Sequence, residues 1–201
     1  MIQNYQYKND LNLNKSLKFG FVRGPVWNFG DEDMKNGIEE FVKNSQLNIE
    51  DLDLGKDFED AAKAHEIIMN GSIANSLINY YQADKSNLHP FTVKRIEAGI
   101  PVSASDYVSA IEKAKKMEQT LRQFFLKYDA IITPSAPGQA PRDLMNTGNA
   151  IFNGYWTMMG VPAISLPLLK GKDNLPIGVQ IITAWKEDDK LLSISKFLLD
   201  T

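Results

Sequence analysis

The stretch YWTMMGVPAISLPL, residues 155–168, gives the clearest indication of the fold. It combines an aromatic helix end, a Gly-Val-Pro turn and a short apolar segment that a second proline ends. Proline cannot continue a helix and interrupts strands, so the pattern predicts a helix followed by a buried strand. Enzymes that attack carbonyl groups often build a wall of the substrate pocket in this way.

Further strands and helices alternate along the chain. We expect strands in SLKFGFVRG (16–24), LNIEDLDLG (47–55), at Ala130–Ile132 and in AISLPL (163–168) and IGVQII (177–182). Helices are expected from Asp31, from Phe58 to about Tyr81 with a possible break near Gly71, from Ser103, over Asn146–Met159 and over about Glu187–Leu199. The prolines and glycine of Thr133–Pro141 predict a loop.

This alternation predicts an α/β fold, a mixed β-sheet flanked by helices. No linker divides the chain, so we expect residues 1–201 to form a single unit with a polar leader over residues 1–16. The long helix after Ser103 should bury Tyr107, Ile111, Ala114, Leu121 and Phe125. The last helix should bury Leu191, Leu192, Ile194 and Leu198.

The composition excludes several classes of function. The chain has 201 residues, of which 43% are hydrophobic and 23% charged, as in ordinary globular proteins. A net charge of -3 argues against a nucleic-acid binder. The absence of cysteine and the presence of only 2 histidines argue against a metal site, and we expect no cofactor. The polar start and the short apolar runs predict a cytoplasmic protein with no membrane partner.

Several motifs in order resemble the C-terminal part of the amidase signature family. They are LRQFFLKYDAIITPSAPGQAP (121–141), FNGYWTMMGVPAISLPL (152–168), LPIGVQII (175–182) and KEDDKLLSISKFL (186–198), with a looser match in KFGFVRGPVWNFGDED (18–33). The resemblance implies the C-terminal part of the amidase signature fold. It also implies hydrolysis or transfer of carboxylic amides, with no metal and no organic cofactor.

Members of this family typically use a Ser-Ser-Lys triad, which lies upstream of the matched motifs. This sequence has no Gly- and Ser-rich loop of that kind, so no catalytic residue can be assigned. The resemblance implies a C-terminal portion that supplies sheet strands and a pocket wall. It also implies that the chain is inactive alone. Expected partners are the missing N-terminal half, or a second copy through an exposed apolar face, and a small-molecule amide substrate once the core is supplied.

Five residues are candidates for the substrate wall. Ser135 and Pro137 follow a strand's carboxyl end, where open α/β sheets bind ligands, although a plain surface loop would look the same. Tyr155 and Trp156 are typical of a pocket lining or of the core, and we expect one of the two in the core. Trp27 follows the first strand and is either a pocket residue or an ordinary loop aromatic.

Other polar residues have simpler interpretations. Gln180 lies mid-strand and should make a structural hydrogen bond, with contact to a substrate as the alternative, and Asp129 should cap or turn the chain. His65 lies in a helix beside Glu66. The residues His89, Ser103 and Asp106 could form a catalytic triad, but their short spacing suits a turn and a helix cap better.

Two other functions remain open. The chain could be a non-catalytic module that binds a small molecule or assembles with a partner. It could also be a fragment of an aminoacyl-tRNA amidotransferase A-type subunit, although the aromatic YWTMMG resembles the general amidases more closely.

Overall fold

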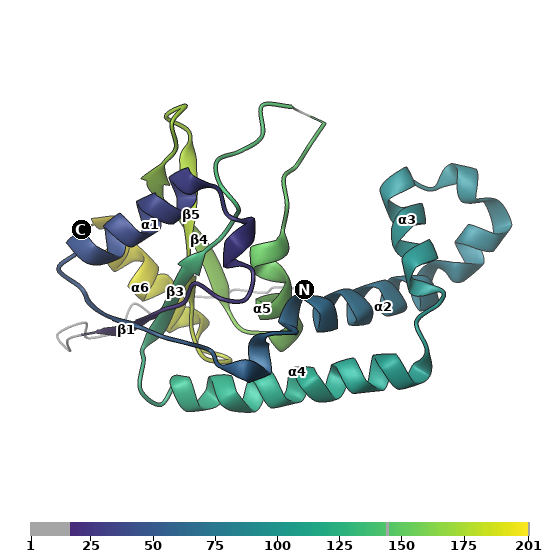
Figure 1. Cartoon of the computed structure of the whole chain (residues 1–201), viewed down its shortest axis with the longest axis horizontal. Helices are drawn as coiled ribbons and strands as arrows, with labels where there is room; N and C mark the ends of the chain where they lie inside the picture. Colours follow the sequence, from purple (N-terminus) through teal and green to yellow (C-terminus); the bar gives the residue numbers. More distant parts are fainter. Residues whose placement is uncertain (1–16, 144, 201) are drawn as a thin grey trace.

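The computed structural model describes residues 17–143 and 145–200, so the leader predicted over residues 1–16 lies outside the described residues. Five strands form one mixed sheet in the order β2-β1-β3-β5-β4 (Figure 1). β1 pairs in parallel with β2 and β3, whereas β5 is antiparallel to both β3 and β4. The strands are β1 (Lys18–Phe21), β2 (Asn48–Asp51), β3 (Ala130–Pro134), β4 (Ala163–Lys170) and β5 (Pro176–Ile182).

The described part of the chain contains six α-helices. They are α1 (Glu32–Asn44), α2 (Ala61–Asp84), α3 (Pro90–Gly99), α4 (Ala104–Phe124), α5 (Ile151–Met159) and α6 (Asp188–Asp200). Helices α1 and α6 lie on one side of the sheet and α5 on the other (Figure 1). The second half of α2, all of α3 and the start of α4 extend away from the sheet. We call these residues, 71–108, the helical arm.

The sheet is the centre of the core. All five residues of β3 are buried, because strands pair on both sides of β3 and helices cover both of its faces. Phe19 and Phe21 of β1 are buried in the same cluster as Met34 and Ile38 of α1. The predicted α/β fold with a mixed sheet and flanking helices is therefore confirmed.

Polar side chains start three of the helices. The Asp31 carboxylate accepts a hydrogen bond from the Met34 N–H (2.8 Å) and caps α1. Ser103 Oγ accepts from the Asp106 N–H (3.0 Å) at the start of α4, as the sequence predicts. His89 Nδ1 accepts from the Phe91 N–H (3.2 Å) at the start of α3. His89, Ser103 and Asp106 are thus helix-start residues, which supports the simpler interpretation over a triad.

Two predicted boundaries were wrong. The loop predicted from Thr133 begins later, because Thr133 and Pro134 still pair with Gln180 and Val179 of β5. Proline is tolerated at this strand end, where the register with β1 has already ended at Ile132. The helix predicted from Asn146 begins only at Ile151, because the preceding asparagine side chains accept backbone N–H groups in local turns that compete with the helix.

Some burial predictions also need correction. Helix α2 runs through Gly71 without a break. Leu192 was predicted to be buried, but it is 37% exposed, because the buried face of α6 includes Ser193 and Ser195 and is turned away from Leu192. In α4 the fully buried residues are Ala110, Met117 and Leu121, whereas the predicted Tyr107, Ile111, Ala114 and Phe125 are only half-buried. No helix in residues 17–143 and 145–200 combines the length and the apolar character needed to cross a membrane.

Candidate functional site

The parallel strands β1 and β3 end at the same edge of the sheet. Val22 N–H donates to the Ile132 carbonyl (2.9 Å), which holds the two chain exits together. The Asp31 N–H donates to the Pro137 carbonyl (2.7 Å), and a side chain at Gly138 would collide with the Asp31 carboxylate. The cap of α1 therefore also fixes the loop after β3.

The structure places Ser135 and Pro137 differently within this loop. Ser135 is buried, and its Oγ accepts a hydrogen bond from Ser165 Oγ of β4 (2.9 Å). Gly178 of β5 lies directly against both hydroxyls. A side chain at this position would collide with them, so the arrangement requires glycine here. Pro137 is half-buried in the loop. Ser135 therefore belongs to a group of polar side chains on the sheet, with Thr133, Gln180 and Ser165, which we call the polar row. Pro137 lies at the border of this row.

The polar row crosses three strands. Thr133, Gln180 and Ser165 are aligned in register on β3, β5 and β4. Gln180 Nε2 donates to Asn153 Oδ1 of α5 (3.0 Å), the kind of structural hydrogen bond that the sequence favours. Thr133 Oγ1 and Gln180 Oε1 are buried without a hydrogen-bond partner in the described part of the chain. Buried polar atoms rarely stay unpaired, so this row differs from ordinary sheet packing.

The aromatic pair of α5 is buried as a unit. Tyr155 and Trp156 are 0% and 1% exposed, and their ring centroids lie 4.7 Å apart. A Cβ at Gly24 would lie 2.6 Å from the Tyr155 hydroxyl, so α5 packs tightly on the exit of β1. Burial raises the pKa of the Tyr155 hydroxyl, which keeps it protonated. Both residues thus contribute to the core, rather than only one of the two.

Trp27 lies in a short turn (Trp27–Phe29) after β1. Its ring meets Phe21 edge-on, with centroids 6.3 Å apart, and the Arg23 guanidinium lies 5.8 Å from its centroid. Trp27 is half-buried. These contacts fix its ring at the rim of the same sheet edge.

A cavity of about 420 Å³ opens where α5 meets α2 and α3, and we call it the α5 cavity. Tyr155, Gly154 and Ile151 line one side of it. The opposite side is formed by His65, Glu66 and Met69 of α2 and Arg95 of α3. Of the five residues proposed from the sequence, the structure places Tyr155 at this cavity.

His65 and Arg95 are two of the polar residues that line the α5 cavity, together with Lys63, Glu66 and Asn149. A Cβ at Gly154 would lie 2.6 Å from His65 Nδ1, so the imidazole packs directly on α5. Burial, and then the charge of Arg95, lower the pKa of His65 below its ordinary value of 6.5, so the ring is neutral at neutral pH.

Arg95 is held in place by three contacts. Its Nη1 donates to Asn70 Oδ1 (3.3 Å) and pairs with Glu66 Oε1 (3.7 Å), while its guanidinium lies 5.0 Å from the Phe91 ring centroid. A fixed guanidinium beside a neutral imidazole can bind a carbonyl or carboxylate oxygen. Sequence reasoning missed Arg95, because a lone arginine in a charged helix looks like a surface residue.

The acidic residues of the described part do not form a metal site, and Asp129 has a structural role. Asp129 closes the start of β1, where its carboxylate accepts from the Lys18 N–H (3.0 Å). Within residues 17–143 and 145–200, no three His, Cys, Asp or Glu side chains are placed to hold a metal ion.

The comparisons with known proteins agree with one another on the family. The family model described as Amidase matches residues 3–192. The chain is 31% identical over 120 residues to the A-type subunit of glutamyl-tRNA(Gln) amidotransferase from Maricaulis maris, covering 54% of this chain and 24% of that protein. It is 36% identical over 135 residues to the corresponding protein of Borreliella afzelii, covering 60% and 28%. The aligned part thus spans about a quarter of these relatives' length.

A solved amidase shares the fold. It has a TM-score of 0.79 at 17% identity, and the match covers 92% of this chain and 46% of that chain. The C-terminal motifs identified in the sequence are therefore parts of one continuous structural match.

Proposed function

Because the chain belongs to the amidase family, we propose that it forms the C-terminal part of an amidase-type hydrolase that acts on carboxylic amides. In this role it contributes sheet strands and part of the substrate-pocket wall. The observation that carries the proposal is the α5 cavity, in which the helix of the YWTMMG motif meets His65 and Arg95. The proposed partners are a small-molecule amide and the rest of the domain, in the cytoplasm.

The chemistry of the wall suits an amide substrate. An amide is neutral and has a carbonyl oxygen that accepts hydrogen bonds, and Arg95 supplies fixed donors. The imidazole of His65 is neutral and so adds no second charge. Ile151 offers an apolar surface at the α5 side of the cavity, with the fully buried ring of Tyr155 behind it. In the completed enzyme, a serine would attack the carbonyl and backbone N–H groups would hold the oxyanion. The C–N bond would then break and the protonated amine would leave, and water would hydrolyse the resulting acyl-enzyme ester to release the acid and free the serine.

Several observations support an incomplete catalytic domain. Among the described residues, β4 has a neighbouring strand on one side only, and Ala163, Ser165 and Pro167 on this strand are exposed. An exposed strand edge offers free backbone groups to another strand. The similar amidase is about twice as long as its matched part. We therefore propose that the remaining part of the domain packs against this region and brings the nucleophile. Loss of nucleophile and base typically lowers turnover by roughly 10⁶-fold, so the chain alone should be inactive.

The proposal can be tested by fragment complementation. The N-terminal part of an active amidase, ending where its match to this chain begins, is mixed with the 201-residue chain. Each component alone should hydrolyse none of a panel of aliphatic and aromatic amides, and the mixture should hydrolyse some of them. Activity of the 201-residue chain alone would contradict its proposed inactivity. A folded chain that neither associates with nor activates the N-terminal part would favour the binding or assembly module instead.

The second candidate is a part of an aminoacyl-tRNA amidotransferase A-type subunit. It is favoured by the relatives in Maricaulis maris and Borreliella afzelii, both described as A-type subunits of glutamyl-tRNA(Gln) amidotransferase. The same mixture separates the candidates when glutamine is included in the panel. Hydrolysis of glutamine with little activity on other amides would support the amidotransferase, and the reverse preference would support a general amidase.

A further inference from the structure

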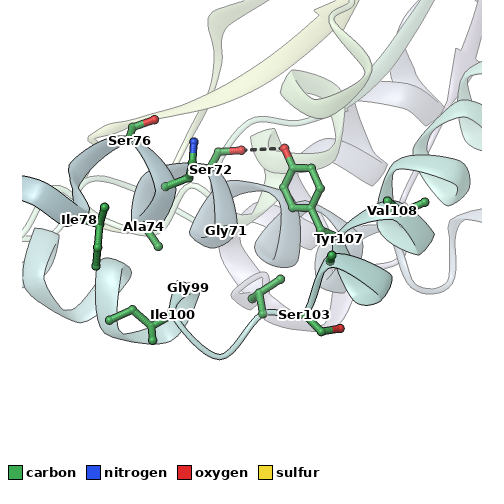
Figure 2. A pocket seen from close by; sticks show the side chains of 13 residues that line it. Gly71, Ser72, Ala74, Ser76, Ile78, Gly99, Ile100, Ser103, Tyr107 and Val108 are labelled. Atoms are coloured by element: carbon green, nitrogen blue, oxygen red, sulfur yellow. Dashed lines mark hydrogen bonds between the residues drawn. The ribbon is translucent and has the colours of Figure 1, made fainter.

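A second cavity lies in the helical arm, between α2, α3 and α4 (Figure 2). It has a volume of about 840 Å³ and shares no lining residue with the α5 cavity. We call it the arm cavity. Small-molecule sites typically measure roughly 300–1,000 Å³, so the arm cavity is large enough for a ligand of its own.

Small residues determine the shape of the arm cavity. A side chain at Gly99 would collide with the carbonyl oxygen of Asn70, so α3 can approach α2 closely only with glycine here. A Cβ at Gly71 would lie 3.0 Å from the Tyr107 ring, so the Tyr107 side chain of α4 also packs closely on α2. Ala74 is buried between them. The cavity is therefore a consequence of close helix packing that the sequence specifies.

The lining of the arm cavity contains no charged residue. Its apolar part includes Ile100 and Val108, whose side chains remain 53% and 54% exposed. Apolar surface exposed in a hollow favours an apolar occupant over water.

The polar side chains of the arm cavity are all uncharged and include Asn75, Ser76, Ser103 and a hydrogen-bonded pair of hydroxyl groups. Ser72 Oγ and Tyr107 OH lie 3.0 Å apart and point toward one another, as Figure 2 shows. Only one of the two hydroxyl hydrogens is used between them, so the pair can still donate one hydrogen bond and accept others. An uncharged ligand with a polar group would match this arrangement, whereas an ionic group would lose hydration without gaining a counter-ion.

We propose that the arm cavity binds an uncharged, largely apolar small molecule with a polar group that hydrogen-bonds to Ser72 and Tyr107. This site is separate from the proposed amide pocket, because their lining residues come from different parts of α2 and α3. Its occupation therefore does not depend on the missing catalytic residues.

Two fluorescent probes that differ in one charged group test the proposal on the full chain. N-phenyl-1-naphthylamine is neutral with one N–H group, and 8-anilinonaphthalene-1-sulfonate has the same rings plus a sulfonate. The neutral probe should bind saturably and at least tenfold more tightly than the sulfonate. Its binding should shift the backbone amide signals of Gly71 and Gly99 in NMR spectra.

Two variants and one control locate the site. Val108→Trp should fill the cavity and abolish saturable binding, whereas Leu126→Trp adds the same ring at a residue that is 81% exposed and should not. Tyr107→Phe keeps the ring but loses the hydroxyl, and it should weaken binding about fivefold. If Val108→Trp fails to fold, the Tyr107→Phe titration and the NMR shifts still locate the probe.

Equal affinity for the two probes, or unchanged binding to Val108→Trp, would overturn the proposal. So would a chain that dimerises in analytical ultracentrifugation and becomes monomeric with Val108→Trp, because a second copy would then occupy the cavity.

Discussion

Replacing Thr133 by valine tests the unusual polar row on the sheet. Thr133 is 0% exposed in β3, and its hydroxyl has no hydrogen-bond partner among the described residues. Burying an unpaired hydroxyl costs about 1–3 kcal/mol in proteins. Valine has a similar shape and is also favoured in strands. Thr133→Val should therefore stabilise the fold rather than damage it.

The magnitude belongs at the lower end of that range. Thr133 offsets part of the rise that burial causes in the pKa of Tyr155, so the two hydroxyls are neighbours, although neither has a hydrogen-bond partner among the described residues. We expect a gain of about 1 kcal/mol in the free energy of unfolding. For a protein of 150–250 residues this corresponds to a rise in Tm of about 2–4 °C.

Thermal and urea unfolding of the full chain measure this effect. Thr120→Val is the matched control, because Thr120 Oγ1 donates to Asp57 Oδ2 (3.1 Å). Loss of this hydrogen bond in Thr120→Val should lower the free energy of unfolding by about 1 kcal/mol. If Thr133→Val lowers Tm by about 2 °C or more, the Thr133 hydroxyl has a partner in solution, such as a buried water, and the reasoning is refuted.

Two further changes test the parts that position the site. Asp31→Ala removes the cap of α1 and should lower the free energy of unfolding in urea by about 1 kcal/mol. Asp53→Ala, in an exposed turn, should lower it by less, and equal losses would contradict the role of Asp31. The pKa of His65 is lowered in the folded chain, so the unfolded state binds more protons and stability falls as the pH drops below about 6.5. His65→Gln should reduce the slope of stability against pH between about pH 7 and 5, and an NMR titration that puts the pKa of His65 above 6.5 would disprove this assignment.

Local sequence patterns predicted most of the fold because they report burial directly. Ala130–Ile132 and IGVQII contain runs of apolar, β-branched residues that fit only a covered strand. Asp31 and Ser103 precede helices with the chemistry that a cap requires. Boundaries were predicted less well where side chains compete with the backbone, as at Asn146 and Asn149.

The candidate site was harder to predict because it depends on contacts between distant segments. Tyr155 could be proposed from its motif, but its neighbours His65 and Arg95 come from α2 and α3 and have no local pattern that marks them. Gly154 allows His65 to pack closely on α5, and Gly24 allows the Tyr155 hydroxyl to pack closely on the chain after β1. Both contacts become visible only once the helices are packed. The unpaired atoms of Thr133 and Gln180 likewise follow from the alignment of β3 and β5.

The central claim is that the α5 cavity is part of the wall of an amide pocket. The most direct measurement is kcat/KM for amide hydrolysis by the complemented mixture. The test variant is Ile151→Trp, which fills this cavity. The control is Leu192→Trp, on the exposed side of α6. We predict that Ile151→Trp lowers kcat/KM at least tenfold while the two parts still associate, and that Leu192→Trp changes it less than twofold. An unchanged kcat/KM with Ile151→Trp would contradict the account.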